Sequence, residues 1–159
     1  MPAESHPRYE DTLFVAGFGS ESVHGLHRWQ LDGTTWIGGC LFPVTELSAL
    51  AQHPTLPVVY GVSGTRHDGR LHAWSVSPGR ERMLSERDSA GVLPAHIAVD
   101  PRGRFAVVAN YGSSSLSVHR LGPDGSFDGA PSVLALTGSG SDVDRQEASH
   151  PHQVVFHDN

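Results

Sequence analysis

Cysteine is nearly absent from this sequence: Cys40 is the only one among 159 residues. A single cysteine cannot form a disulfide within the chain. Chains without internal disulfides are typical of reducing compartments, so we expect a cytoplasmic protein. Basic residues are also scarce, with 11 Lys and Arg against 17 Asp and Glu and a formal net charge of -6. Nucleic-acid binding needs clustered basic residues, so we expect no nucleic-acid partner.

Long apolar runs are missing as well. No stretch reaches the length that a transmembrane helix requires, so we expect no membrane partner. The first residues, "MPAESHPRYED", are polar and lack the apolar region of a signal peptide. We expect residues 1–11 to be a flexible N-terminal segment and residues 12–159 to form one domain, a length that can bury a real core.

Glycine (18), proline (11) and histidine (11) are plentiful, and the glycines and prolines mark the turns of a repeat. Three segments share one pattern of an apolar strand, a break with glycine, an alternating strand and a turn. They begin "LFVAGFG" at Leu13, "PVVYGVSG" at Pro57 and "RFAVVANYG" at Arg104. Alternation with period two indicates strands, and a repeat of roughly 40–50 residues is typical of propeller blades. A β-sandwich or an irregular barrel are the alternative architectures.

The expected fold is therefore all-β: a β-propeller of four-stranded antiparallel blades, with about three blades and the first strand of a fourth. The blades span 12–42, 47–86 and 95–137, and the next starts at 152–157. Their expected strands are 12–17, 24–31, 35–42, 47–52, 57–62, 71–77, 81–86, 95–100, 104–110, 115–121 and 132–137. Two sheet edges then stay unpaired, which is a liability. We expect the chain either to be part of a longer propeller or to self-associate through these edges.

Propeller geometry places the candidate site. The loops between the second and third strands of each blade share one face with the crossovers between blades. That face collects the long segment "GSGSDVDRQEASHPH" and the loops around 17–24, 63–69 and 110–114. Long loops in compact domains are usually functional. The candidate residues converging there are His96, Asn110, Tyr111, Arg145, Glu147, His150 and His152.

Two motifs at these residues resemble the seven-bladed propeller lactonase family, which includes propeller-type 6-phosphogluconolactonases and carboxymuconate lactonising enzymes. They are "LPAHIAVDPRGRFAVVANYGSSSLSVHRLGPDGSF" and "GSGSDVDRQEASHPHQVVF". The chain resembles the N-terminal half of that propeller. One position departs from the family pattern: the second blade has "VSG" where members often have an Asn-Glu pair.

The resemblance implies hydrolysis of a sugar lactone, similar to 6-phosphogluconolactone, in carbohydrate metabolism of the pentose phosphate type. A muconate-type lactonising isomerase and a non-catalytic module that binds a ligand or a protein are the alternatives. Lactone opening needs a base for water and donors for the oxyanion. His96 or His152 is the expected base, supported by Glu147. Arg145 can clamp an anion, and His150, Asn110 and Tyr111 are expected to bind substrate.

Each of these residues also has a structural interpretation. His96 can cap its strand, and the two histidines of "HPH" can form a rigid turn with one ring inward and one outward. Arg145 and Glu147 can be a surface ion pair of little consequence, and Asn110 suits a turn. The ligand types for a divalent metal are present, but His-x-His spacing is a weak signal. We therefore expect neither a metal nor another cofactor.

Overall fold

The computed structural model describes residues 11–19 and 24–157 and contains eleven strands in three antiparallel sheets. Within those two ranges there is no helix, and hence none that could cross a membrane. The strands are β1 (Thr12–Gly17), β2 (Gly25–Asp32), β3 (Thr35–Phe42), β4 (Leu47–Gln52), β5 (Val58–Ser63), β6 (Arg70–Ser75), β7 (Arg82–Asp88), β8 (Pro94–Val99), β9 (Phe105–Asn110), β10 (Ser115–Leu121) and β11 (Phe127–Ala135). Apart from Asp11, the segment expected to be flexible lies outside the described residues.

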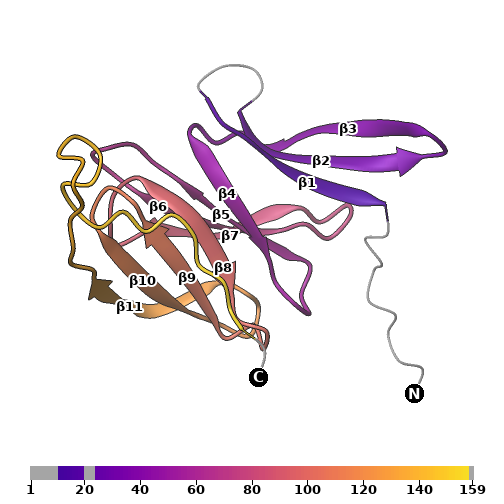
Figure 1. The fold of residues 1–159 in the computed structure, drawn as a ribbon. Helices are drawn as coiled ribbons and strands as arrows, with labels where there is room; N and C mark the ends of the chain where they lie inside the picture. Colours follow the sequence, from indigo (N-terminus) through magenta and orange to yellow (C-terminus); the bar gives the residue numbers. More distant parts are fainter. Residues whose placement is uncertain (1–10, 20–23, 158–159) are drawn as a thin grey trace.

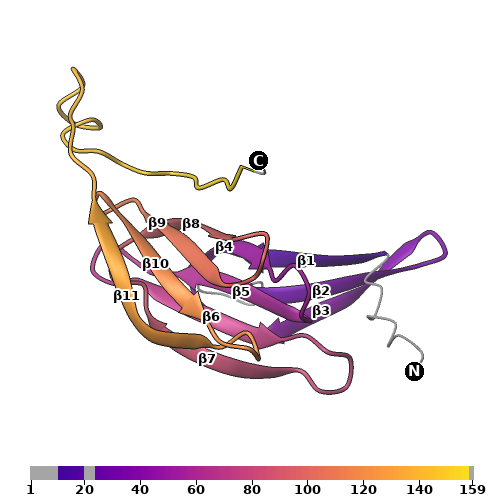
Figure 2. The same cartoon turned by 90° about the horizontal axis from the view of Figure 1, so that it is seen from below.

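Each sheet is a meander in chain order: β1-β2-β3, then β4-β5-β6-β7, then β8-β9-β10-β11. The second sheet lies between the other two, and the innermost strands β1, β4 and β8 are neighbours (Figures 1 and 2). This arrangement is that of successive propeller blades. The predicted all-β partial propeller is confirmed. Among the described residues, the first sheet has no strand inside β1, as expected.

Two strand assignments from the sequence differ from the structure by more than two residues. The last strand of the third blade, expected at 132–137, is the longer β11, Phe127–Ala135. A register shift between Val118 and Arg120 lets β11 continue past Gly129, which adopts a left-handed φ of 63°. The expected strand at 152–157 is not formed, because a strand requires a paired neighbour and no described strand pairs with this segment.

Buried side chains fill both spaces between the sheets. Between the second and third sheets, Tyr60 packs against Phe127 with ring centroids 5.7 Å apart, and its hydroxyl donates to the Gly125 carbonyl at 2.8 Å. Between the first and second sheets, the fully buried Trp74 stacks on Phe42 at 5.7 Å. Large buried aromatic side chains of this kind dominate core energetics. They hold the three sheets in fixed relative positions, which matters because the site is assembled from loops of two of them.

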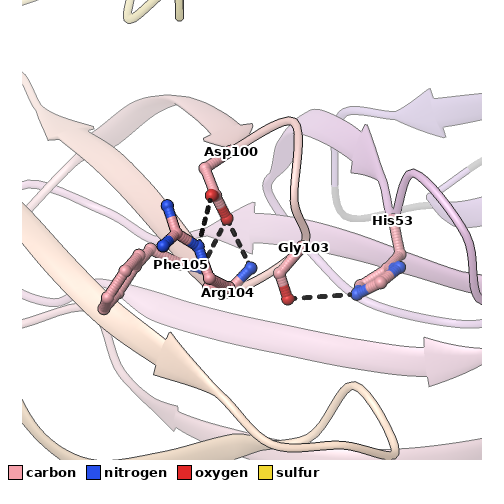
Figure 3. A network of polar contacts seen from close by, with 5 residues as sticks. All are labelled: His53, Asp100, Gly103, Arg104 and Phe105. Atoms are coloured by element: carbon pink, nitrogen blue, oxygen red, sulfur yellow. Dashed lines mark hydrogen bonds and ion pairs between the residues drawn. The ribbon is translucent and has the colours of Figure 1, made fainter.

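A polar network fastens the turns on the face opposite the candidate site (Figure 3). Asp100 accepts backbone N–H groups from Arg104 and, at 2.8 Å, from Phe105, and it pairs with Arg104 Nε at 3.1 Å. Gly103 has a φ of 66°, which only glycine adopts freely. Its carbonyl lies 3.2 Å from Nε2 of the buried His53, and a Cβ on Gly103 would collide with that ring. The turn of the third blade is thus locked onto the turn of the second.

Candidate active site

The candidate site lies where the segment after β11 returns to the inner strands. This segment leaves the outer edge of the third sheet and runs back across the innermost strands (Figures 1 and 2). It encloses a cavity of about 490 Å³ with loops of the second and third blades. The lining residues are Arg66, Leu93, Tyr111, Gly112, Asp144, Arg145, Glu147 and His150. The loops expected to share one face therefore do so.

Local hydrogen bonds explain how this segment presents Arg145. The Asp142 carboxylate accepts the N–H groups of Asp144 at 3.1 Å and Arg145 at 3.2 Å, which is how Asp closes a tight turn. The turn is completed by Gln146, whose N–H donates to the Asp142 carbonyl at 2.7 Å. The Gln146 carbonyl accepts from Gly140 at 2.7 Å. The Arg145 side chain is left exposed at the cavity, which its sequence position alone did not guarantee.

His150 lines this cavity and makes several contacts. Its ring stacks on Tyr111 with centroids 4.4 Å apart and an interplanar angle of 15°. Nδ1 lies 3.0 Å from the Tyr111 carbonyl, and Nε2 lies 3.2 Å from Glu147 Oε1. Both ring nitrogens therefore face oxygen acceptors, and a doubly protonated ring satisfies both contacts. Glu147 thus pairs with His150; within the described part of the chain it makes no ion pair with Arg145, contrary to the surface-pair alternative.

A second cavity, of about 350 Å³, lies beside the first and shares Tyr111 and Leu93 with it. His152 lines this cavity, with its ring edge-on to Tyr111 at 5.9 Å. His150 is half-buried and His152 exposed, so the two histidines of "HPH" do point to different environments. They nevertheless both contact the Tyr111 ring.

His96 lies in β8, near His152. Its half-buried ring accepts the Val154 N–H at Nδ1 over 3.4 Å, so it bonds to backbone as the structural interpretation expected. Burial lowers the pKa of His96, and the neighbouring His152 lowers it further. A neutral His96 beside His152 gives the site one imidazole that resists protonation near neutral pH.

Asn110 does not join these residues. Its side chain is fully buried, and Nδ2 donates to Ser117 Oγ at 3.2 Å and to the Ser89 carbonyl at 3.5 Å. His119 lies in the same buried network, with Nε2 3.0 Å from Ser117 Oγ, and burial lowers the pKa of His119 to about 4. The expectation that Asn110 contacts the substrate is therefore corrected: its side chain is buried in the core. Asn110 anchors the end of β9 and fixes the position of Tyr111, the next residue.

The structure adds one residue that the sequence reasoning did not single out. Arg66 lines the larger cavity together with Arg145, from the loop between β5 and β6. The signal for it was its place in "SGTRHDG", a loop already expected on this face. A lone arginine in a loop is more often solvated surface than ligand, and only the cavity distinguishes the two.

A Ser–His–Glu line in the second sheet has the residue types of a nucleophilic triad. Ser63 Oγ lies 2.8 Å from His72 Nε2, and His72 Nδ1 lies 3.2 Å from Glu86 Oε2 without the alignment of a hydrogen bond. Ser63 is only 5% exposed and lines neither cavity, so it has no access to a substrate. Burial lowers the pKa of His72 although Glu86 opposes the shift. We assign this line to the core.

No group of three His, Cys, Asp or Glu side chains within residues 11–19 and 24–157 is arranged to hold a metal ion. The contact between Glu147 and His150 is a hydrogen-bonded ion pair.

Comparison with known proteins identifies the family of this chain. The family model described as "Lactonase, 7-bladed beta-propeller" matches residues 12–159. The chain belongs to the seven-bladed β-propeller lactonase family. The match includes both cavities and all the candidate residues.

Two curated relatives of this chain are named 6-phosphogluconolactonase. The protein of Formosa agariphila is 29% identical over 152 residues, covering 91% of this chain and 43% of the relative. The protein of Bacillus subtilis is 30% identical over 101 residues, covering 62% of this chain and 29% of the relative. The chain therefore spans less than half the length of these relatives.

Solved structures agree on the fold. A Bacteroides uniformis protein, crystallised as a candidate 6-phosphogluconolactonase, has a TM-score of 0.77 and 23% identity, covering 87% of this chain and 41% of that one. A periplasmic gluconolactonase of Pseudomonas aeruginosa has a TM-score of 0.69 and 22% identity, covering 83% and 40%. At such identities the likeness shows the propeller fold alone.

Proposed function

We propose that this lactonase-family chain hydrolyses a sugar lactone, of the 6-phosphogluconolactone type, to the open-chain acid in carbohydrate metabolism. The observation that carries the proposal is the arrangement around Tyr111. The imidazole of His152, which can move a proton, lines the second cavity, and an arginine that can hold an anion lines the first. The names of the curated relatives support the same reaction.

The reaction consumes one water and moves one proton in two steps. A base removes a proton from water, and the water oxygen bonds to the lactone carbonyl carbon. The ring C–O bond then breaks, and the proton passes to the leaving alkoxide to give a hydroxy acid. His152 is the better placed base, because its ring is exposed in the cavity and makes no hydrogen bond with a described residue. His96 has Nδ1 engaged by Val154, and we assign it the support of the developing charge.

Glu147 and His150 act together in this scheme. Because Glu147 bonds to His150 Nε2 and His150 bonds to the Tyr111 carbonyl, the pair holds the Tyr111 ring between the two cavities. Glu147 is therefore a positioning residue. It was expected to support a catalytic base, and in this scheme it does so by fixing the position of Tyr111. Arg145 binds an anionic group of the substrate, for which its forked guanidinium is suited.

The experiment measures hydrolysis of glucono-δ-lactone and 6-phosphoglucono-δ-lactone against the uncatalysed rate. His152→Ala should lower kcat by about 10²- to 10⁴-fold, the usual contribution of a general base. Arg145→Ala should raise KM. His157→Ala, a nearby exposed histidine, is the matched control. If His152→Ala leaves kcat at the wild-type value, this assignment is wrong; a protein that binds 6-phosphogluconate without hydrolysing either lactone is instead a binding module.

We also propose a cytoplasmic location, because phosphorylated sugars are charged and are retained where they are made. The lone cysteine supports a reducing compartment. The fold does not determine the compartment, since the Pseudomonas aeruginosa neighbour is described as periplasmic.

Self-association through open sheet edges is part of the same proposal. The innermost strand of the first sheet, β1, exposes Leu13 (48%) and Val15 (44%), and its inner edge pairs with no described strand. Edge strands with exposed apolar side chains favour pairing with another strand. A further blade or a second copy of this chain would satisfy that edge.

A further inference from the structure

Two arginine side chains line the larger cavity. Arg66 comes from the loop after β5 and Arg145 from the segment after β11, so different blades supply them. Neither guanidinium group makes a hydrogen bond or ion pair within the described part of the chain, which leaves their N–H donors available. Arginine prefers planar acceptors with two oxygens, which carboxylate and phosphate groups provide.

The loop that carries Arg66 is fixed in place. Thr65 donates to the Asp68 carboxylate through both its N–H and its hydroxyl, each at 2.8 Å. The Leu93 N–H donates back to the Thr65 carbonyl at 2.9 Å, which fastens this loop to the third blade. Leu93 lines both cavities. The backbone under Arg66 is therefore ordered before a ligand arrives, which lowers the entropic cost of binding.

The charges of this cavity favour an anion. Two carboxylates line it, but Glu147 is already paired with His150 at 3.2 Å. The remaining carboxylate is that of Asp144, against the two guanidinium groups of Arg66 and Arg145. The unpaired groups of the cavity thus sum to a net positive charge. A phosphate monoester carries a charge of about −1.5 to −2 at pH 7 and matches two guanidinium groups better than a neutral sugar hydroxyl does.

Tyr111 separates this charged cavity from the one that holds His152, because its side chain lines both. A sugar lactone with a phosphate at the far end of its carbon chain has two chemically different ends. A sugar ring that lies beside Tyr111 would place the phosphate among the arginines and the lactone carbonyl near His152. The two cavities match the two ends of such a molecule.

We propose that Arg66, together with Arg145, binds the substrate phosphate and makes this chain selective for a phosphorylated sugar lactone. This inference rests on the proposed lactone hydrolysis and names the substrate class. Arg66 occupies a loop directly after "VSG", where the sequence departs from the family pattern.

The test compares kcat/KM for 6-phosphoglucono-δ-lactone with kcat/KM for glucono-δ-lactone. Arg66→Ala should lower the ratio of the two values about tenfold to a hundredfold, the effect of one charge-assisted contact. Arg66→Lys should recover part of it, because it restores the charge without the fork. Asp144→Asn should raise the ratio, since it removes the opposing charge. Arg102→Ala, an exposed arginine in the turn 101–104 on the opposite face, is the matched control and should leave the ratio unchanged.

An unchanged ratio in Arg66→Ala, or an equal loss on both lactones, overturns this inference while the proposed hydrolysis stands. If the wild type hydrolyses neither lactone, the proposed function fails and calorimetry decides the inference alone. Tighter binding of 6-phosphogluconate than of gluconate, weakened about tenfold or more by Arg66→Ala, then supports the phosphate site. Equal binding of the two acids, or no binding, overturns it.

Discussion

Protonation of the buried His119 is expected to destabilise this fold in mild acid. The ring lies in β10 with no exposed surface, and Nε2 contacts Ser117 Oγ at 3.0 Å and the Ser89 carbonyl at 3.4 Å. Its Nδ1 has no partner among the described residues. Burial lowers the pKa of His119 from 6.5 to about 4.

The sign and size of the effect follow from this shift in pKa. Between pH 6.5 and pH 4 the unfolded chain binds a proton at His119 that the folded chain does not. The free energy of unfolding is therefore highest above pH 6.5 and falls as the pH decreases. The loss from His119 alone is about 2 kcal/mol between pH 8 and pH 5, and about 3 kcal/mol by pH 4.

His119→Gln tests this reasoning, because the amide nitrogen can replace Nε2 as a donor but does not titrate. Urea unfolding at pH 8 and pH 5 gives the stability difference between variant and wild type at each pH. That difference should shift by about 2 kcal/mol in favour of the variant at pH 5. His67→Gln, on an exposed loop, is the control. The reasoning is refuted if wild type and His119→Gln lose the same stability between the two pH values. Other histidines with lowered pKa values contribute equally to both proteins and cancel.

Two further predictions concern the turns on the face opposite the candidate site and the unpaired sheet edges. His53→Ala removes the acceptor of two backbone N–H groups and the donor to the Gly103 carbonyl. It should cost about 2–4 kcal/mol in thermal or urea unfolding, and His53→Asn, which keeps an acceptor oxygen, should cost less; equal costs would contradict the assigned roles of the two ring nitrogens. For the edges, sedimentation should give a mass above the 17.0 kDa of one chain, and a stable monomer would contradict self-association through β1.

The blade pattern was predictable because it depends on local rules. Alternating apolar residues and glycine- or proline-containing turns placed β1, β3, β4 and β10 at their observed bounds. The long segment before His152 was also recognisable as a crossover toward the inner strands. The interruption at Gly129 misled the assignment of β11, because pairing across a bulge depends on the partner strand rather than on the sequence around the glycine.

The site was predictable by face but not by side chain. Tyr111, Arg145, Glu147 and His150 line one cavity as the loop topology implied. Asn110 was expected beside them because it ends the same strand. Its side chain instead lies on the side of β9 that meets Ser89 of the preceding blade. Successive residues on a strand point to opposite faces, and the sequence does not say which face a neighbouring sheet will cover.

The sequence by itself determined the repeat, the strand-rich fold and the loops that meet at one end, because these depend on residue spacing and turn chemistry. Only the tertiary structure decided that Asn110 is a buried anchor, that Glu147 pairs with His150, and that Arg66 joins Arg145 at one cavity. These outcomes depend on contacts between residues far apart in the chain, such as the bond from Leu93 to Thr65 that fastens the Arg66 loop. No local pattern encodes such contacts, because they exist only once the blades have packed.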